Sequence, residues 1–200
     1  MPNHHRQMLD VMGAVPAGTP LLLHACCGPC ASAVLERLCA HFRVTVLYFN
    51  PNIAPDAEWQ LRRQTLLQLL DQLRPAHPLG YIERAGDEAL FLKACAGLET
   101  APEGGARCAA CFHLRLEETA RHAAALGCEW FCTTLTVSPH KNAALVNEAG
   151  QAAAQRFGPR FLPSDFKKQD GYRRSVVLSE QYGLRRQSYC GCRFSWPKEG

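Results

Sequence analysis

Short apolar runs alternate with amphipathic segments along this chain, and the alternation constrains its fold more than any other feature. Strands that alternate with helices are typical of a parallel sheet, so we expect an α/β fold with helices on both faces of the sheet. Four runs have the length and composition of strands, and a fifth is a candidate for a short one: PLLLHA (20–25), RVTVLYFN (43–50), LGYIE (79–83), EWFCTTLT (129–136) and FLPSDF (161–166).

Helical patterns fill the intervals between these runs. Asp56 is well placed as the N-cap of one helix, and Gly127 as the stop of another. Residues 1–19 are interpreted as a loose leader or a short N-terminal helix, and residues 20–200 as a single α/β catalytic domain. The expected helices cover 31–42, 56–73, 88–95, 112–127, 140–157 and 171–183.

The cysteine content is high for a chain of this size. The sequence has 200 residues, of which 47% are hydrophobic and eleven are cysteine. A core of that size needs no disulfides to hold it. We see neither a membrane-spanning run nor a signal peptide, so we expect a cytoplasmic protein with no membrane partner. In a reducing compartment, cysteines in this number favour metal or redox chemistry over a disulfide framework.

Positive charge is concentrated near the C-terminus. Residues 156–200 contain ten Lys or Arg and four Asp or Glu, whereas residues 1–155 contain twelve and fourteen. A basic C-terminal segment favours a polyanionic partner, and nucleic acid is the leading candidate. The alternative is a solvated basic tail without a partner.

Three cysteines occupy five positions in HACCGPCA, directly after the first expected strand. Cys26, Cys27 and Cys30 would therefore lie at the carboxyl edge of the sheet, where α/β folds place their chemistry. In nucleotide-binding proteins of this architecture the same turn is rich in Gly and Ser, whose amides hold phosphate. A thiolate beside a helix N-terminus is stabilised as the anion, which is the form that binds metal.

A CxxC motif, formed by Cys108 and Cys111 in RCAACF, lies at the start of another expected helix. Alone, such a motif is shared by zinc sites, iron–sulfur sites and dithiol oxidoreductases. Together with Cys26 and Cys27 it offers four thiolates, which suit zinc or an iron–sulfur cluster. Adjacent cysteines bind two different irons more comfortably than they chelate one tetrahedral zinc, so this pair favours the cluster.

A third pair, Cys190 and Cys192 in YCGC, lies close to the C-terminus. The glycine between them lets the two sulfurs meet. We expect a strained and easily reduced disulfide, which could deliver two electrons. The alternative is that the pair supplies metal ligands. The other four thiols lie in apolar contexts and are interpreted as buried structural residues: Cys39, Cys95, Cys128 and Cys132.

The motifs together resemble the QueH family of epoxyqueuosine reductases. The resemblance covers residues 21–195 and is carried, in this order, by LLLHACCGPCA, YFNPNIAP, EGGARCAACFHLRLEETA, TTLTVSPHKN, SDFKKQDGYRRS and RRQSYCGCRFS. It implies a Rossmann-like sheet of the adenine-nucleotide-hydrolase (HUP) type. It also implies the final step of queuosine formation in tRNA, in which the epoxide of epoxyqueuosine at the wobble position loses its oxygen.

The resemblance further implies a four-iron–four-sulfur (4Fe-4S) cluster, an additional mononuclear iron and no cobalamin. Cys26, Cys27, Cys108 and Cys111 match the cluster ligands. Cys190 and Cys192 match the redox-active pair of the family. Cys30 stands where some relatives carry aspartate, at a position associated with the extra iron, so we expect Cys30, Cys190 and Cys192 to act in catalysis and to hold that iron in part. An iron with an open site could act as a Lewis acid on the epoxide oxygen.

Polar residues near the expected carboxyl edge and in the basic segment are candidates for tRNA contacts. His24 could orient a ligand or be a satisfied core histidine, and Tyr172 or Tyr189 could stack on a base or pack in the core. For each basic residue the alternative is an ordinary solvated surface, and for Ser138 it is helix capping. The candidates are Ser138, His140, Lys141, Lys167, Lys168, Arg173, Arg174, Arg185 and Arg186.

Three other functions compete with this one. A tRNA-thiolating enzyme that uses ATP would need a Gly/Ser phosphate loop after the first strand, and HACCGPCA lacks it. A zinc-stabilised tRNA-binding protein would lack the absorbance of a cluster near about 400 nm. A dithiol oxidoreductase would use Cys27 and Cys30, but it leaves the RCAACF cysteines unexplained. The electron donor and the oligomeric state are not specified by the sequence.

Overall fold

The first strand, PLLLHA, lies at the centre of a parallel sheet. The computed structural model describes residues 2–196, and within them the sheet has five strands in the order β3-β2-β1-β4-β5. The strands are β1 (Pro20–Ala25), β2 (Arg43–Tyr48), β3 (Gly80–Glu83), β4 (Trp130–Thr133) and β5 (Arg160–Phe161). The expected α/β fold is therefore confirmed, and the last four residues of the basic segment, 197–200, lie outside the described part.

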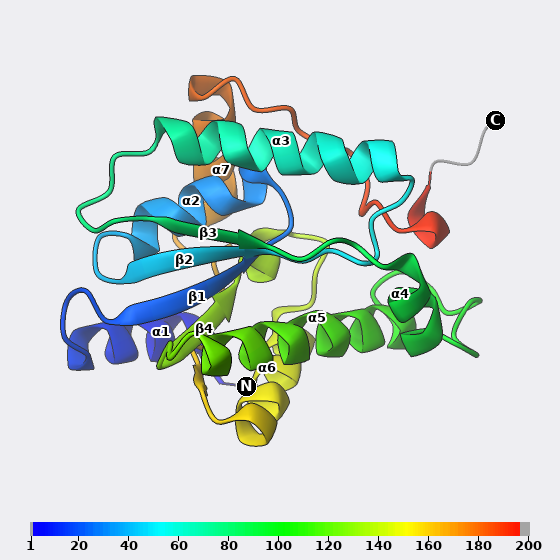
Figure 1. Ribbon diagram of the computed structural model, residues 1–200, viewed down its shortest axis with the longest axis horizontal. Helices are drawn as coiled ribbons and strands as arrows, with labels where there is room; N and C mark the ends of the chain where they lie inside the picture. The colour runs from blue at the N-terminus through cyan, green and yellow to red at the C-terminus, as the bar shows by residue number, and fades with distance from the viewer. Residues whose placement is uncertain (1, 197–200) are drawn as a thin grey trace.

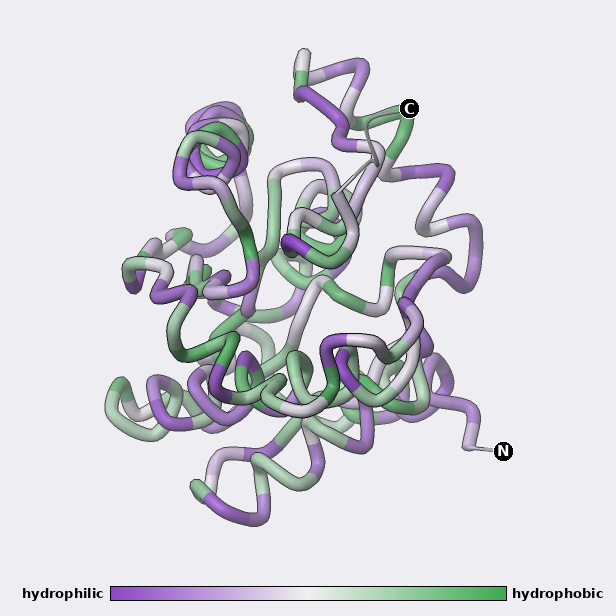
Figure 2. Tube along the Cα trace, turned by 90° about the vertical axis from the view of Figure 1, so that its right-hand side faces the viewer, coloured by the Kyte–Doolittle hydropathy of each residue, from purple (hydrophilic) through white to green (hydrophobic). Residues whose placement is uncertain are grey.

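Helices cover the two faces of this sheet, as Figure 1 shows, with α2, α3 and α7 above it and α5 and α6 below it. The outer helices carry both hydrophilic and hydrophobic stretches in Figure 2, as expected for helices that are solvated on one side. The helices are α1 (His4–Ala14), α2 (Gly28–Leu38), α3 (Asp56–Gln72), α4 (Glu88–Ala94), α5 (Ala106–Ala125), α6 (Ala143–Phe157) and α7 (Gly171–Gln181).

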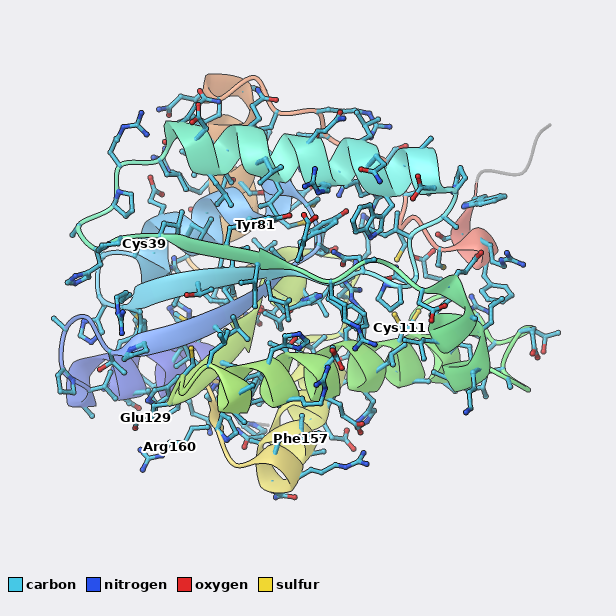
Figure 3. The ribbon with its side chains drawn as sticks, in the orientation of Figure 1. Cys39, Tyr81, Cys111, Glu129, Phe157 and Arg160 are labelled. Carbon is cyan, nitrogen blue, oxygen red and sulfur yellow. The ribbon has the colours of Figure 1, made fainter. Side chains whose placement is uncertain are left out.

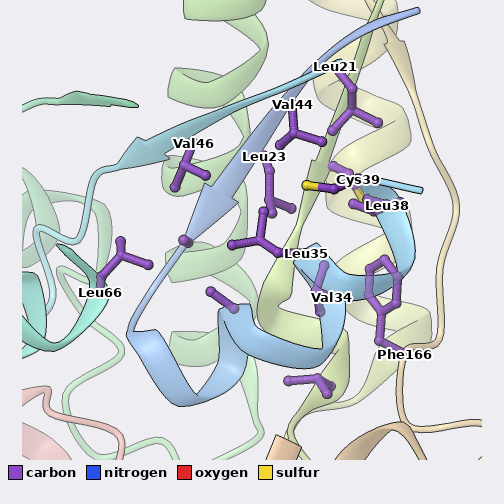
Figure 4. Close-up of a cluster of buried hydrophobic side chains, with 14 of the residues drawn as sticks. Leu21, Leu23, Val34, Leu35, Leu38, Cys39, Val44, Val46, Leu66 and Phe166 are labelled. Atoms are coloured by element: carbon purple, nitrogen blue, oxygen red, sulfur yellow. The ribbon is translucent and has the colours of Figure 1, made fainter. Parts of the chain in front are cut away.

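Alternate residues of β1 feed the two halves of the core. Leu21 and Leu23 point into a cluster with α2 and α3, which Figure 4 shows. Leu22 points to the other face and packs in a cluster with α5 and α6. Because the side chains of a strand alternate between the faces of a sheet, an uninterrupted run of three leucines is the pattern of a strand buried on both sides.

Several element boundaries differ from the sequence predictions. The helix after β1 begins at Gly28 rather than residue 31, because Pro29 fits the first turn of a helix, where its missing N–H costs nothing. Asp56 is the first residue of α3 and not its N-cap, which is Pro55. The fourth strand ends at Thr133, whose side chain accepts a hydrogen bond from the Leu135 amide and starts a 3-10 helix, η1 (Thr134–Val137).

The helix that carries the CxxC motif is longer than expected. It begins at Ala106 instead of residue 112, so both cysteines of the motif lie within its first two turns. Its predicted end is confirmed, because Gly127 follows the last turn with a φ of 65°. The Cys128 amide then donates to the Ala123 carbonyl at 2.9 Å, which satisfies a carbonyl at the helix C-terminus.

The N-terminal residues form a helix rather than a loose leader. Asn3 caps α1 by accepting a hydrogen bond from the Arg6 amide. Met8 is fully buried and belongs to the same core cluster as Leu21 and Leu23. Among the described residues, no helix combines the length and the apolar character needed to cross a membrane.

Candidate metal and redox centre

The turn after β1 places three thiols together. The sulfur atoms of Cys26, Cys27 and Cys30 all lie within 4.8 Å of one another, and those of Cys26 and Cys27 are 3.7 Å apart. Gly28 fixes this turn against α3, because a Cβ at that position would lie 2.6 Å from the Thr65 carbonyl oxygen. The arrangement needs a glycine in HACCGPCA for close packing as well as the cysteines for chemistry.

The three thiols share one negative charge. Hydrogen bonds from Cys27 and Cys30 hold the pKa of the Cys26 thiol well below its usual range. The same hydrogen bond to Cys26 raises the pKa of Cys27 to about 12, and hydrogen bonding to Cys26 and Cys27 raises the pKa of Cys30. The turn therefore presents a thiolate with two thiols as donors, which is a ready set of soft ligands once the remaining protons leave.

The CxxC cysteines lie one turn apart at the start of α5. Cys108 accepts a hydrogen bond from the Gly104 amide, with 3.2 Å between nitrogen and sulfur. Cys111 is buried, and burial raises its pKa to about 12. Figure 3 shows Cys111 on the side of the molecule toward which the strand arrows point. The i, i+3 spacing puts both side chains on one face of the helix.

The third pair consists of free thiols, so the expected disulfide is not formed between Cys190 and Cys192. The Cys192 thiol donates to Cys190, and together with the charges of Lys141 and Arg115 it lowers the pKa of Cys190 to about 5. Gly191 between them has a φ of 97°. The structure therefore contains the reduced form of the pair, with the Cys190 thiolate already stabilised.

A buried arginine that the sequence analysis missed holds this segment in place. Arg62 pairs with Glu58 at 2.7 Å, and their side chains are only 3% and 7% exposed. Its guanidinium also donates to the carbonyls of Cys190 at 2.8 Å and of Tyr189 at 3.2 Å. A helix residue far from the cysteines in sequence thus fixes the backbone of YCGC, and no local pattern in α3 signals that role.

Two adjoining cavities bring the three cysteine groups together at the carboxyl edge of the sheet. The larger has a volume of about 530 Å³ and is lined by Cys26, Cys30 and Cys190. The smaller is lined by Cys108, Cys111, Cys190 and Cys192. Both cavities share the side chains of Asn52, Glu103, Arg115, His140, Lys141 and Cys190.

Arg115 is the most buried cation of this site and was also missed by the sequence analysis. It is 2% exposed. Its Nη2 donates to Asn50 Oδ1 at 2.6 Å, and its Nε lies 3.2 Å from His24 Nε2. The one sequence signal for it was its position four residues after Cys111, which places it one turn further along the same face of α5.

His24 is a neutral core residue that orients this arginine. Burial, aided by the charge of Arg115, lowers the pKa of its imidazole to about 3. Because a guanidinium can only donate, His24 Nε2 accepts from it and Nδ1–H donates to Thr133 Oγ1 at 2.9 Å. The Phe49 carbonyl, 3.1 Å from the same Nε2, therefore receives no proton from the ring.

The predicted tRNA-contact residues fall into two groups. Ser138, His140, Lys141 and Arg186 line the larger cavity, beside the exposed Tyr172. Ser138 also accepts a hydrogen bond from the His140 amide at 3.3 Å, but the N-cap of α6 is Asn142.

The other basic candidates lie farther along the surface, and several are already engaged. Lys167 donates to the Thr136 and Lys141 carbonyls and pairs with Asp165. Arg174 pairs with Glu36 through two hydrogen bonds, and Arg185 pairs with Glu58. Lys168 and Arg173 are exposed.

The four cysteines interpreted as structural are all buried, but one lies beside the site. Cys95 is 1% exposed and packs in a small cluster with Cys111, Cys192 and Phe91. Cys132 contacts the Leu162 carbonyl at 3.5 Å. Cys39 and Cys128 belong to the two large core clusters.

Comparison with known proteins identifies relatives along nearly the whole chain. A family model described as "Epoxyqueuosine reductase QueH" matches residues 21–198. A QueH from Streptococcus pyogenes serotype M1 is 36% identical over 197 residues, which cover 98% of this chain and 77% of the relative. A QueH from Staphylococcus epidermidis is 39% identical over 184 residues, covering 90% and 77%, and one from Thermotoga maritima is 33% identical over 179 residues, covering 88% and 89%.

A solved structure shares the fold at low sequence identity. The chain is similar to the U34-tRNA thiolase NcsA from Methanococcus maripaludis with its [4Fe-4S] cluster, with a TM-score of 0.54 and 11% sequence identity. The similarity covers 97% of this chain and 67% of the thiolase. At this identity the likeness supports the Rossmann-like architecture alone.

Proposed function

The chain belongs to the QueH family of epoxyqueuosine reductases, which are oxidoreductases, and we propose that it reduces the epoxide of epoxyqueuosine in tRNA to queuosine. The observation that carries the proposal is the convergence of three cysteine groups on two adjoining cavities. The larger cavity has the size usual for small-molecule and cofactor sites. A single nucleoside could enter it from solvent and meet thiols at its inner wall.

The reaction needs two electrons and two protons. Opening the epoxide and forming the alkene breaks both C–O bonds, and the oxygen leaves as water. Oxidation of the Cys190 and Cys192 thiols to a disulfide releases two electrons and two protons, so the pair balances one turnover. An external reductant of unidentified nature must then reduce the disulfide. The lowered pKa of Cys190 keeps this thiol in its reactive form near neutral pH.

The side chains present fit a metal–sulfur group. Thiolates are soft ligands that suit zinc and iron–sulfur clusters. The Oδ1 atom of Asn52, which lines both cavities, is buried and has no hydrogen-bond partner among the described residues. We propose that Cys26, Cys27, Cys108 and Cys111 hold a 4Fe-4S cluster, and the thiolase that shares the fold is described with such a cluster.

The same reasoning extends to a second iron. Cys30 and Cys190 face the larger cavity, so with Cys192 they are candidates for holding an iron next to the bound nucleoside. When bound, the cluster supplies single electrons and the iron supplies a Lewis acid for the epoxide oxygen. The protein itself orients the nucleoside and limits access of water.

We propose that the wobble nucleotide enters the larger cavity past α7. Tyr172 is 40% exposed at its rim, and Arg186 lies over its ring at 5.6 Å from the centroid. An aromatic ring in this position can stack on a splayed base, which is how proteins commonly hold single-stranded RNA. A shallow groove on the other side of α7 is lined by Arg37, Arg173 and Arg174, which suits the flanking phosphates.

The test is an anaerobic reconstitution with iron and sulfide counted per chain. We expect about four of each for the cluster, a brown protein, and conversion of epoxyqueuosine to queuosine in tRNA measured by nucleoside mass spectrometry. Cys108→Ser should lose most of the conversion, and so should removal of iron by a chelator. Cys128→Ser, a buried cysteine in the core cluster away from the cavities, is the matched control.

Two results would contradict the proposal. Full conversion by a metal-free preparation would exclude the metal scheme. Stoichiometric zinc without conversion would instead support the zinc-stabilised binding protein. Conversion that survives Cys190→Ser would remove the dithiol from the reaction while leaving the metal site to be judged by the iron and sulfide counts.

A further inference from the structure

The guanidinium of Arg115 presents a charge that the described protein does not neutralise with a carboxylate. The side chain is 2% exposed, and a guanidinium stays protonated in proteins. Its hydrogen-bond acceptors are His24 Nε2 and Asn50 Oδ1, both of which are neutral groups. Among the salt bridges of residues 2–196, none includes Arg115.

A buried charge without a counter-charge is strongly unfavourable, so the surroundings of Arg115 decide its role. It lines both cavities, at the place where the cysteine groups approach each other. Glu103 also lines both cavities but is exposed to solvent. Lys141 adds a second positive charge on the same walls. The anions that Arg115 can meet are therefore the thiolates of Cys26, Cys111 and Cys190.

We propose that Arg115 is the buried counter-cation of the thiolate centre, held in place by His24 and Asn50. Each metal-bound thiolate brings negative charge into a part of the protein with little water, and the fixed guanidinium offsets it. The proposal rests on the proposed function only in that a metal–thiolate group occupies these cysteines. It makes Arg115 a positioning and electrostatic residue, separate from the thiols that react.

This role has a consequence that a packing role lacks. If the charge of Arg115 is offset only when metal-bound thiolates are present, its removal should weaken the metal-loaded protein more than the metal-free protein. A nearby positive charge also favours the reduced form of a cluster, because that form is more negative. Removal of the charge should therefore lower the midpoint potential.

The experiment compares Arg115→Gln, Arg115→Lys and wild type, each with and without metal. For Arg115→Gln we expect a smaller gain in Tm on metal loading than in wild type. We also expect reduction of the cluster to be at least tenfold less favourable, which for one electron is about 59 mV lower in midpoint potential. Arg115→Lys keeps the charge and should recover most of both quantities.

Asn50→Asp tests the same idea without removing the arginine. It places a carboxylate where Arg115 now has an amide oxygen at 2.6 Å, so the guanidinium is neutralised by the protein. We expect the same direction of change in potential and loading gain as in Arg115→Gln. This variant decides the question if Arg115→Gln does not fold.

Arg121→Gln is the matched control, because Arg121 lies on the same helix, is 54% exposed and pairs with Glu118. It should leave both quantities unchanged. Equal losses of Tm in the loaded and metal-free forms of Arg115→Gln, with an unchanged potential, would overturn the proposal. Neither measurement uses tRNA, so a failure of the epoxide reaction in wild type would refute the proposed function and leave this result standing. The loading gain can be measured with zinc as well as with iron.

Discussion

Single residues determine whether the YCGC segment can take its observed shape. Gly191 has a φ of 97°, a conformation that side chains with a Cβ rarely adopt. A Cβ there would also lie 2.8 Å from Nη2 of Arg62. The guanidinium that holds the carbonyls of Tyr189 and Cys190 therefore occupies the space that a side chain at this position would need.

Gly191→Ala should destabilise the protein and displace the dithiol. The same φ of 97° occurs at Gly158, where a Cβ would have nothing within 4 Å. Gly158→Ala therefore measures the backbone strain alone, which we expect to cost about 1 kcal/mol. Gly191→Ala should cost at least about 1 kcal/mol more, because Arg62 must also move. Urea unfolding of the metal-free protein checks this, and equal costs for both variants would show that the contact with Arg62 carries no weight.

Helix α3 acts as the support of the C-terminal segment. Besides the carbonyl contacts of Arg62, Gln68 donates to the Tyr182 and Gly183 carbonyls at 2.9 and 3.2 Å. Glu58 pairs with Arg62 and, from the segment itself, with Arg185. One face of this helix thus holds backbone that is more than a hundred residues away in sequence.

Glu58→Gln should therefore destabilise the protein in a pH-dependent way. Burial acts to raise the pKa of Glu58, but hydrogen bonds from Arg62 and Arg185 hold it below its usual 4.5. A carboxyl whose pKa is lowered by folding contributes stability above about pH 4.5 and loses it as the pH falls through its folded value. We expect a loss of about 3 kcal/mol at pH 7, because the variant leaves Arg62 buried without its counter-charge, and a shrinking difference from wild type below pH 4.5.

Glu83→Gln is the comparison for this measurement. Glu83 pairs with Arg63 of the same helix, but the two side chains are 37% and 30% exposed. Its loss should cost about 1 kcal/mol or less at any pH. Urea denaturation between pH 3 and 8 distinguishes the two variants, and a Glu58→Gln effect as small as that of Glu83→Gln would remove the anchoring role of α3.

At the scale of the whole molecule, the cavity and the positive charge lie on one side. The cysteine groups lie at the carboxyl edge of the sheet, and α7 carries exposed Tyr172 and Arg173 beside the larger cavity. Arg160 starts β5 opposite Trp130, the first residue of β4, and so lies at the amino edge. Only part of the basic C-terminal charge can therefore face a tRNA whose wobble nucleotide is in the cavity.

Neutralising Lys168 and Arg173 should weaken tRNA binding without affecting the metal centre. For the double variant with Gln at both positions, we expect the slope of log Kd against log salt to fall by about one for each lost phosphate contact. Arg160→Gln, at the opposite edge, should leave the slope unchanged. Filter binding at several salt concentrations measures this, and equal effects of both substitutions would mean that the basic residues act through net charge alone.

The sequence by itself determined the features that arise from local pattern and from family resemblance. The alternation of PLLLHA-type runs with helical segments was sufficient for the parallel sheet, because a buried parallel strand requires uninterrupted apolar residues. The cysteine groups were visible for the same reason, since each pair is close in the chain. Helix starts were less well predicted, because Ala106 and Gly28 begin helices through packing and turn geometry that the sequence pattern does not contain.

Tertiary structure decided which side chains surround those cysteines. Arg62 and Arg115 read as ordinary charged residues of amphipathic helices, yet each is almost completely buried. Their burial depends on partners that are distant in sequence: the Cys190 carbonyl for one, and His24 and Asn50 for the other. A charge can be buried only where the fold assembles acceptors and counter-charges around it, and that assembly exists only after the strands have been placed side by side.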